Sequence, residues 1–223
     1  MSILAIETAC SCQTIGTPQK IRFCEPHHRY WFGDRQLASF HSVLNAIYPQ
    51  KQAELGKIDP VTLEHARERG LRVDRYCSEY APSGNVRIDP GEWQEVVERV
   101  RIFVNWFEIR KPGVRGVQQI VYSLDDGVAT TKDFDFTWDD KAVICDLKCT
   151  YSLDWTWKAQ LGCHARYSVC GTDGLYYFLY ILHINPKLYA KSGGFRLLPY
   201  DRTECLRIWD AAVAWWRELP KKE

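Results

Sequence analysis

The sequence of 223 residues lacks any apolar run as long as the ~18 residues that cross a bilayer. It also lacks a basic segment ahead of its first apolar residues, because Met-Ser-Ile-Leu-Ala-Ile is followed at once by Glu7. A secretory signal peptide and a membrane partner are therefore not expected. A protein of the cytoplasm is predicted, or of the host-cell cytoplasm if the source is viral.

The chain also contains no internal repeat, no low-complexity segment and no linker. A single domain over residues 1–223 is therefore predicted, with residues 1–20 as a loose N-terminal arm because they show no clear period. At 46% hydrophobic and 26% charged residues, the composition is that of an ordinary globular protein large enough for a proper core.

Neither sign of charge is in excess, since 29 Lys and Arg stand against 28 Asp and Glu. Binding to a nucleic acid would therefore require a local basic patch and not a global field. The nine cysteines include no Cys-x-x-Cys pair. Such scatter is typical of reduced, buried thiols in a cytosolic protein and not of a disulfide framework.

One stretch, residues 130–150, has the pattern of a hairpin that carries acids. Two strand-like segments, residues 131–137 and 142–149, are joined by the polar turn Trp-Asp-Asp-Lys. Side chains alternate along a strand, so Asp146 and Lys148 project from the same face, about 7 Å apart. The hairpin is expected to bring Asp133 close to both.

Two carboxylates and a lysine at a strand end have a chemical use. Carboxylate oxygens are hard ligands of the kind that Mg²⁺ and Mn²⁺ prefer, together with waters and phosphate oxygens. Such a metal polarises a phosphodiester and lowers the pKa of a bound water, and a nearby ammonium can orient that water. The alternative is a surface hairpin whose charges only keep the sheet edge soluble.

The order of these motifs resembles the PD-(D/E)XK nuclease superfamily, in its RecB-like and phage-exonuclease branch. Asp133 follows Ala-Thr-Thr-Lys, and Asp146-Leu-Lys148 follows the apolar Ala-Val-Ile-Cys. A helix bearing a glutamine comes next in that branch, and Gln160 stands in the corresponding place. His164 departs from the pattern, which has tyrosine there. The resemblance spans about residues 25–218.

Two further positions depart from the branch. Its Gly-x-x-x-His motif reads Gly70-Leu-Arg-Val-Asp74 here, and its usual Glu is Gln118. A carboxylate can replace imidazole on Mg²⁺, being the harder ligand. The other interpretation of Asp74 is a solvated helix residue paired with Arg72 or Arg75.

The resemblance implies a ligand set and roles for the motif residues. The metal would be Mg²⁺, with Mn²⁺ able to substitute, held by Asp133, Asp146 and the main-chain carbonyl of Leu147, with Asp74 and Gln118 completing the shell. Lys148 would position the attacking water and Gln160 would orient the site. Some members hold an iron–sulfur cluster, but Cys205 alone near the C-terminus does not favour one here.

Lys158 and Arg166 lie on the helix expected after residue 152, and they are candidates for contacts to substrate phosphates. A solvated helix face explains them equally well. Asp-Pro pairs predict two earlier helices by capping, starting at Asp59 and Asp89. The expected elements are a hairpin over 22–40, helices over 42–48, 59–80, 89–110, 153–168 and from 201, and strands over 114–123, 131–137, 142–149 and 175–184.

The element order predicts an α/β protein with a mixed central β-sheet flanked by helices, which the resemblance makes a restriction-endonuclease-like core. The implied activity is that of a metal-dependent deoxyribonuclease, an exonuclease, acting on DNA. A helicase or annealing protein could be its partner. The alternative is a catalytically weakened module of the same fold that binds DNA or a protein in a repair or recombination complex.

Overall fold

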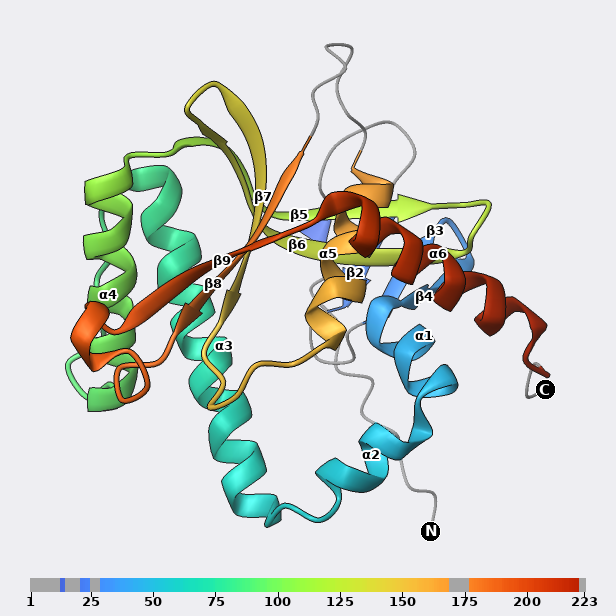
Figure 1. Ribbon diagram of the computed structural model, residues 1–223, viewed down its shortest axis with the longest axis horizontal. Helices are drawn as coiled ribbons and strands as arrows, with labels where there is room; N and C mark the ends of the chain where they lie inside the picture. Colours follow the sequence, from blue (N-terminus) through green and yellow to red (C-terminus); the bar gives the residue numbers. More distant parts are fainter. Residues whose placement is uncertain (1–12, 15–20, 25–28, 169–176, 221–223) are drawn as a thin grey trace, which may run out of the picture.

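The computed structural model describes residues 13–14, 21–24, 29–168 and 177–220 (Figure 1). Most of the predicted N-terminal arm lies outside these ranges. Within them, no helix combines the length and the apolar character that a bilayer crossing requires. The helices are α1 (Phe40–Ile47), α2 (Pro49–Leu55), α3 (Pro60–Ser83), α4 (Gln94–Arg110), α5 (Thr156–Tyr167), the 3₁₀ turn η1 (Ala190–Ser192) and α6 (Arg202–Glu218). The strands are β1 (Gln13–Thr14), β2 (Ile21–Cys24), β3 (Arg29–Phe32), β4 (Arg35–Ser39), β5 (Gly113–Ser123), β6 (Val128–Trp138), β7 (Lys141–Lys148), β8 (Phe178–Ile184) and β9 (Phe195–Tyr200).

The strands form one mixed sheet in the order β1-β2-β3-β4-β6-β7-β8-β9, with β5 paired to β6. Two pairings are parallel, β4 with β6 and β7 with β8, and the others are antiparallel. Parallel neighbours need a crossover, and α5 supplies the one between β7 and β8. The predicted fold class, a mixed sheet flanked by helices, is confirmed.

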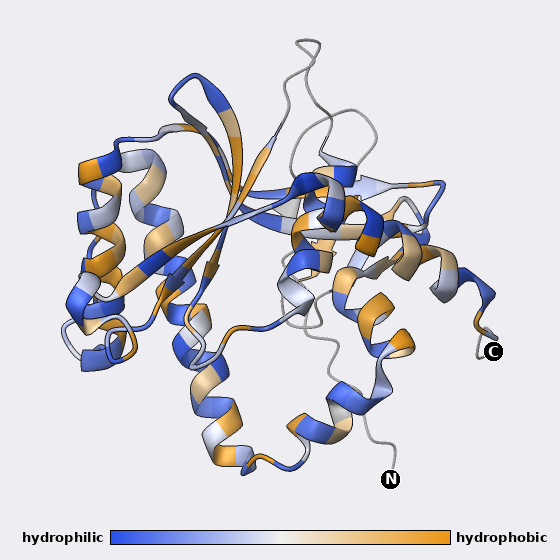
Figure 2. Ribbon diagram, in the orientation of Figure 1, coloured by the Kyte–Doolittle hydropathy of each residue, from blue (hydrophilic) through white to orange (hydrophobic). Residues whose placement is uncertain are grey.

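Helices cover both faces of the sheet (Figure 1). On one face α3 and α4 pack side by side over a core that includes Phe103, Trp106, Phe134 and Phe136. On the other face α1, α5 and α6 bury a second set of residues around Trp209. Figure 2 shows hydrophobic residues along β7 and β8, the strands between these two cores, whereas the tip of the β6–β7 hairpin is hydrophilic.

The sheet forks beside β6. One edge of β6 pairs with β4 only at Val128 and Ala129, and the same edge pairs with β7 only from Phe134 onward. Between these points, residues 130–132 of β6 keep β5 as their strand partner on the opposite edge. The fork leaves a local opening through the sheet where side chains from both faces can meet.

The hairpin predicted over residues 131–149 is confirmed, with Trp138 opposite Lys141. Asp139 and Asp140 both have positive φ, 48° and 58°, as a two-residue type I′ turn requires. The predicted cap of α3 is also confirmed, since Asp59 accepts the Thr62 N–H. The last helix, predicted from residue 201, begins at Arg202, and Asp201 caps it by accepting the Glu204 N–H.

Two predicted helix starts are wrong. The helix expected from Asp89 begins at Gln94, because the Asp89 carboxylate accepts the Tyr76 hydroxyl 2.8 Å away instead of capping a helix. The helix expected from residue 153 begins at Thr156, whose N–H is accepted by Asp154.

Pro49 follows the helix predicted over residues 42–48, which ends at Ile47 as α1. This proline starts α2, consistent with the fit of proline to the first turn of a helix. The first strand of the N-terminal hairpin, expected as continuous from residue 22 to 32, is divided between β2 and β3, with residues 25–28 outside the described ranges.

Candidate functional site

Asp133 lies at the end of the fork, where β6 meets β7. The register that pairs Phe134 with Cys145 would, if continued, place Asp133 opposite Asp146. Instead of another ladder bond, the Leu147 N–H donates to Oδ2 of Asp133 at 2.8 Å. The carboxylate thus takes the place of a strand carbonyl at the point where the ladder opens.

Asp146 is the most buried acid of the site, with 0% of its surface exposed. The Gln160 side-chain amide on α5 donates to its Oδ1 at 2.9 Å, and the Lys148 ammonium forms an ion pair with Oδ2. Asp146 and Lys148 of the hairpin are therefore close together, as predicted, and Gln160 of α5 joins them. Lys148 itself keeps 19% of its side chain exposed, so this end of the cluster opens to solvent.

Asp74 reaches the site from α3, on the opposite face of the sheet. The Gln118 side-chain nitrogen donates to both of its carboxylate oxygens, at 2.9 and 3.1 Å, and to the Ser78 hydroxyl at 3.2 Å. Gln118 has a φ of 49°, a left-handed conformation that is uncommon for a non-glycine residue in a strand. Its backbone strain is thus located at the site, where these hydrogen bonds hold its side chain.

The three carboxylates interact electrostatically. Burial raises the pKa of Asp74 to about 7, and the negative charge of Asp146 adds to this effect. Burial, followed by the charges of Asp146 and Asp74, holds the pKa of Asp133 well above its ordinary value. For Lys148, burial alone would lower the pKa, but Asp146 and Asp133 raise it above its ordinary value. With all four groups ionised, three carboxylates and one ammonium leave a net charge of −2.

These residues fit a divalent cation by their chemistry, since repelling carboxylates at a solvent-accessible opening are hard ligands in need of positive charge. Among the described residues, however, no three His, Cys, Asp or Glu side chains are already gathered closely enough to hold a metal ion. Each carboxylate is instead turned to a donor of the protein: Asp74 to Gln118, Asp133 to the Leu147 N–H and Asp146 to Gln160. Metal binding would have to exchange some of these contacts.

His164, which stands where the resembled branch has tyrosine, is a neighbour of the site to which the sequence pattern gave no role. Its side chain is fully buried on α5, with Nδ1 3.9 Å from Oδ1 of Asp146 and Nε2 3.4 Å from the Thr130 hydroxyl. Burial lowers its pKa to about 4, so the imidazole is neutral near pH 7. The four-residue spacing from Gln160, which places both on one helix face, is the signal that could have indicated it.

Lys158 and Arg166 are engaged elsewhere. The Lys158 ammonium lies 2.6 Å from the Glu204 carboxylate, and Arg166 Nε lies 2.9 Å from the Asp210 carboxylate. Both partners belong to α6, so these ion pairs connect α5 to α6. A contact with substrate phosphate would require breaking them, and nothing in this arrangement supports the predicted role.

The sequence matches no protein-family model and no curated protein. Among solved structures, the chain is similar to an alkaline exonuclease (LHK-Exo) from Laribacter hongkongensis, at 9% sequence identity and a TM-score of 0.44. The similarity covers 81% of this chain and 86% of that chain. A likeness of this degree assigns neither a family nor an activity.

Proposed function

We propose that this protein is a metal-dependent deoxyribonuclease that hydrolyses DNA phosphodiester bonds, acting as an exonuclease. The observation that carries the proposal is the meeting of Asp133, Asp146 and Lys148 with Asp74 at the fork of the sheet. Three carboxylates at an opening, with one ammonium among them, suit a cation and a phosphate together.

The carboxylates and the Leu147 carbonyl are the proposed metal ligands. Asp74, Asp133 and Asp146 would hold Mg²⁺ or Mn²⁺, which when bound polarises a phosphodiester and lowers the pKa of a coordinated water. The Leu147 N–H points toward β6, and a residue in an antiparallel ladder presents its carbonyl to the same neighbour. The Leu147 carbonyl is therefore available on the side of Asp133.

Lys148 and Gln160 would act on orientation and charge. The Lys148 ammonium would orient the attacking water and offset negative charge on the phosphate oxygens. Gln160, already bound to one oxygen of Asp146, would keep that carboxylate in one orientation while its other oxygen faces the site.

The test is cleavage of end-labelled single- and double-stranded DNA in Mg²⁺, in Mn²⁺ and in EDTA. Lys148→Ala should lower the metal-dependent rate by about 100-fold or more, a loss typical of removing one transition-state stabilising group. Lys141→Ala is the matched control, an exposed lysine at the other end of β7. Unchanged cleavage by a folded Lys148→Ala variant would exclude the proposed role.

A second candidate is a DNA-binding or protein-binding module with weakened catalysis, acting with a helicase or annealing protein. Gln118 favours it, because an amide donates to Asp74 where the resembled branch carries a carboxylate. Calorimetric titration separates the two candidates. Absence of Mg²⁺ and Mn²⁺ binding, with DNA binding retained, would support the module and count against the nuclease.

A further inference from the structure

Tyr151 is an exposed aromatic side chain that the protein holds in place. It is 59% exposed, yet the Arg69 guanidinium lies 4.9 Å from its ring centroid and donates to its hydroxyl at 3.3 Å. Arg69 is only 2% exposed, and it also donates to the Cys149 carbonyl at 3.3 Å. Arg69 of α3 therefore holds the Tyr151 side chain in one orientation, while much of the ring remains exposed to solvent.

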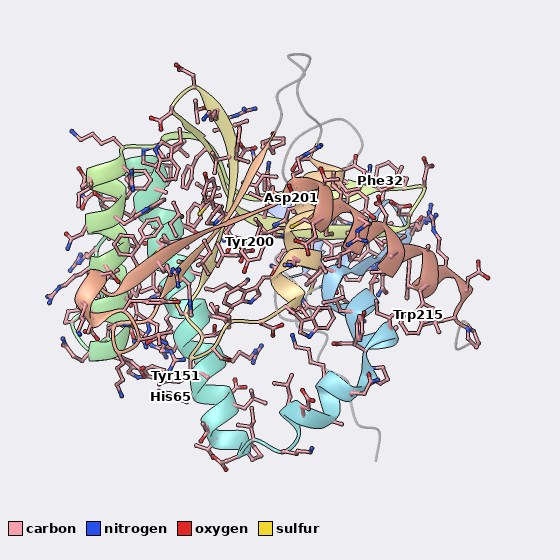
Figure 3. The ribbon with its side chains drawn as sticks, viewed as in Figure 1. Phe32, His65, Tyr151, Tyr200, Asp201 and Trp215 are labelled. Carbon is pink, nitrogen blue, oxygen red and sulfur yellow. The ribbon has the colours of Figure 1, made fainter. Side chains whose placement is uncertain are left out.

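The position of Tyr151 relates it to the carboxylate cluster. It follows Lys148 by three residues, and its anchor Arg69 precedes Asp74 by five residues on α3, about 7.5 Å along the helix axis. Figure 3 shows Tyr151 beside α3, near His65 and far from Trp215 on α6. A chain-like ligand with one unit at the cluster would therefore have its neighbouring unit within reach of Tyr151.

The surface of α3 is open at Gly70, next to Arg69 in the sequence. Gly70 lies one helical turn before Asp74, and a Cβ added at Gly70 would meet no heavy atom within 4 Å. A glycine in a helix interior costs about 1 kcal/mol relative to alanine, and packing against the sheet does not compensate for it here. This bare helix surface allows a ligand backbone to approach closely between the cluster and Tyr151.

The anchor of Tyr151 is a cation, Arg69, which shares a carboxylate with a second guanidinium. Arg69 and Arg99 are 2% and 5% exposed, and both lie within ion-pair distance of the same carboxylate, Glu95, at 3.3 and 3.6 Å. The Nε atoms of both arginines have no hydrogen-bond partner among the described residues. Two guanidinium groups that share one carboxylate favour an anionic ligand over an apolar one.

We propose that Tyr151 stacks on an unpaired base of the DNA strand, next to the nucleotide whose phosphodiester lies at the carboxylate cluster. The inference rests on the proposed function and deepens it, because it specifies the form of the substrate at the site. Aromatic side chains stack on bases without regard to sequence, and a base inside a duplex has no free face to offer. The strand therefore reaches the cluster in single-stranded form, over Gly70 and with a base on Tyr151.

The experiment compares single-stranded oligonucleotides that carry one abasic site at successive positions. For the wild-type protein, an abasic site at one particular position should lower both affinity and kcat/KM by about 5- to 100-fold. Tyr151→Ala should lower them by a similar factor on the intact strand and show no further loss at that abasic position. Tyr151→Phe, which keeps the ring, should remain close to wild type.

The control is Trp215→Ala, which removes an aromatic residue of similar exposure, 52%, from α6. It should behave as wild type, and Mn²⁺ binding by Tyr151→Ala should equal that of wild type. The inference would be overturned if the abasic site lowered the affinity of Tyr151→Ala by the same factor as that of wild type. It would also be overturned if Tyr151→Ala bound and cleaved the intact strand as wild type does.

Because affinity and cleavage are measured separately, failure of the stacking role can be distinguished from failure of the proposed nuclease function. Cleavage by the wild type without any effect of Tyr151→Ala overturns the stacking role alone. Binding that depends on Tyr151 without any cleavage overturns the nuclease and leaves the stacking role standing. Absence of both binding and cleavage overturns both.

Discussion

The side-chain nitrogen of Gln118 lies 2.9 and 3.1 Å from the two carboxylate oxygens of Asp74, so an amide donor satisfies the one acid that α3 brings to the fork. This contact stabilises the carboxylate in the absence of a cation. It also occupies the oxygens that a cation would need. The balance between these two effects can be measured.

Gln118→Glu replaces that donor with a second carboxylate. In EDTA the variant should unfold at a lower temperature than wild type, because two half-buried acids then face each other. Added Mn²⁺ should raise its Tm by more than it raises that of wild type, because stabilisation follows affinity for the folded state. Gln36→Glu, at an exposed position of β4, is the control; an equal response to Mn²⁺ in wild type and Gln118→Glu would show that position 118 takes no part in metal binding.

Asp74→Asn removes one of three like charges but keeps an oxygen that can accept from Gln118. Burial and the charge of Asp146 disfavour the ionised Asp74, so its removal should raise the free energy of unfolding in EDTA at pH 8 by more than about 1 kcal/mol. The same variant should lose metal-dependent cleavage. Urea unfolding measures the first effect, and Asp34→Asn in an exposed turn should change it little. A destabilised Asp74→Asn variant would mean that the acid serves the fold and not a site.

Two helical glycines should respond to alanine with opposite signs. A Cβ at Gly162 of α5 would lie 2.1 Å from the Cys205 carbonyl oxygen on α6 and 2.9 Å from Trp209 Cβ. Gly162→Ala should therefore separate α5 from α6 and cost about 1–3 kcal/mol. Gly70→Ala meets open space and should stabilise the protein by about 0.5–1 kcal/mol. Urea unfolding of the pair provides the comparison, and a stabilising Gly162→Ala would contradict the close helix contact.

His183 should make stability depend on pH. Burial lowers its pKa, while its Nε2 lies 2.8 Å from the Thr150 carbonyl and its Nδ1 2.8 Å from the Tyr189 hydroxyl. The folded state thus favours the neutral ring, whereas the unfolded chain binds a proton near pH 6.5. Because the unfolded state binds more protons, this contribution is present above about pH 6.5 and is lost as the pH falls toward the folded pKa. His183→Gln should show a shallower decline in the free energy of unfolding between pH 7 and 5, and parallel slopes for both proteins would contradict the assignment.

Local patterns were sufficient for much of the fold. The turn residues Asp139 and Asp140, the alternation along β6 and β7, and the cap at Asp59 all act over a few residues, so their consequences could be predicted by position. The helix start predicted at Asp89 is wrong, because the Asp89 carboxylate accepts a hydrogen bond from the Tyr76 hydroxyl, 13 residues away, instead of capping a helix. A capping preference of about 1 kcal/mol is easily overridden by such a contact.

The candidate site divides in the same way. The hairpin brings Asp133 to Asp146 and Lys148 through a register that is readable from the chain. The pairing of Gln118 with Asp74 spans 44 residues and that of Arg69 with Tyr151 spans 82, and neither leaves a local signal. The burial of His164 against Asp146 likewise depends on how α5 packs.

The sequence alone was enough to predict the hairpin of β6 and β7 with its polar turn, the other central strands and most helices, because these depend on neighbouring residues and on side-chain alternation. Only the tertiary structure decided that the sheet forks at residues 130–133, that α3 delivers an acid through the opening, and that each carboxylate meets a donor of the protein. Those outcomes depend on packing between segments far apart in the chain, where burial and charge act through distance in space and not along the sequence.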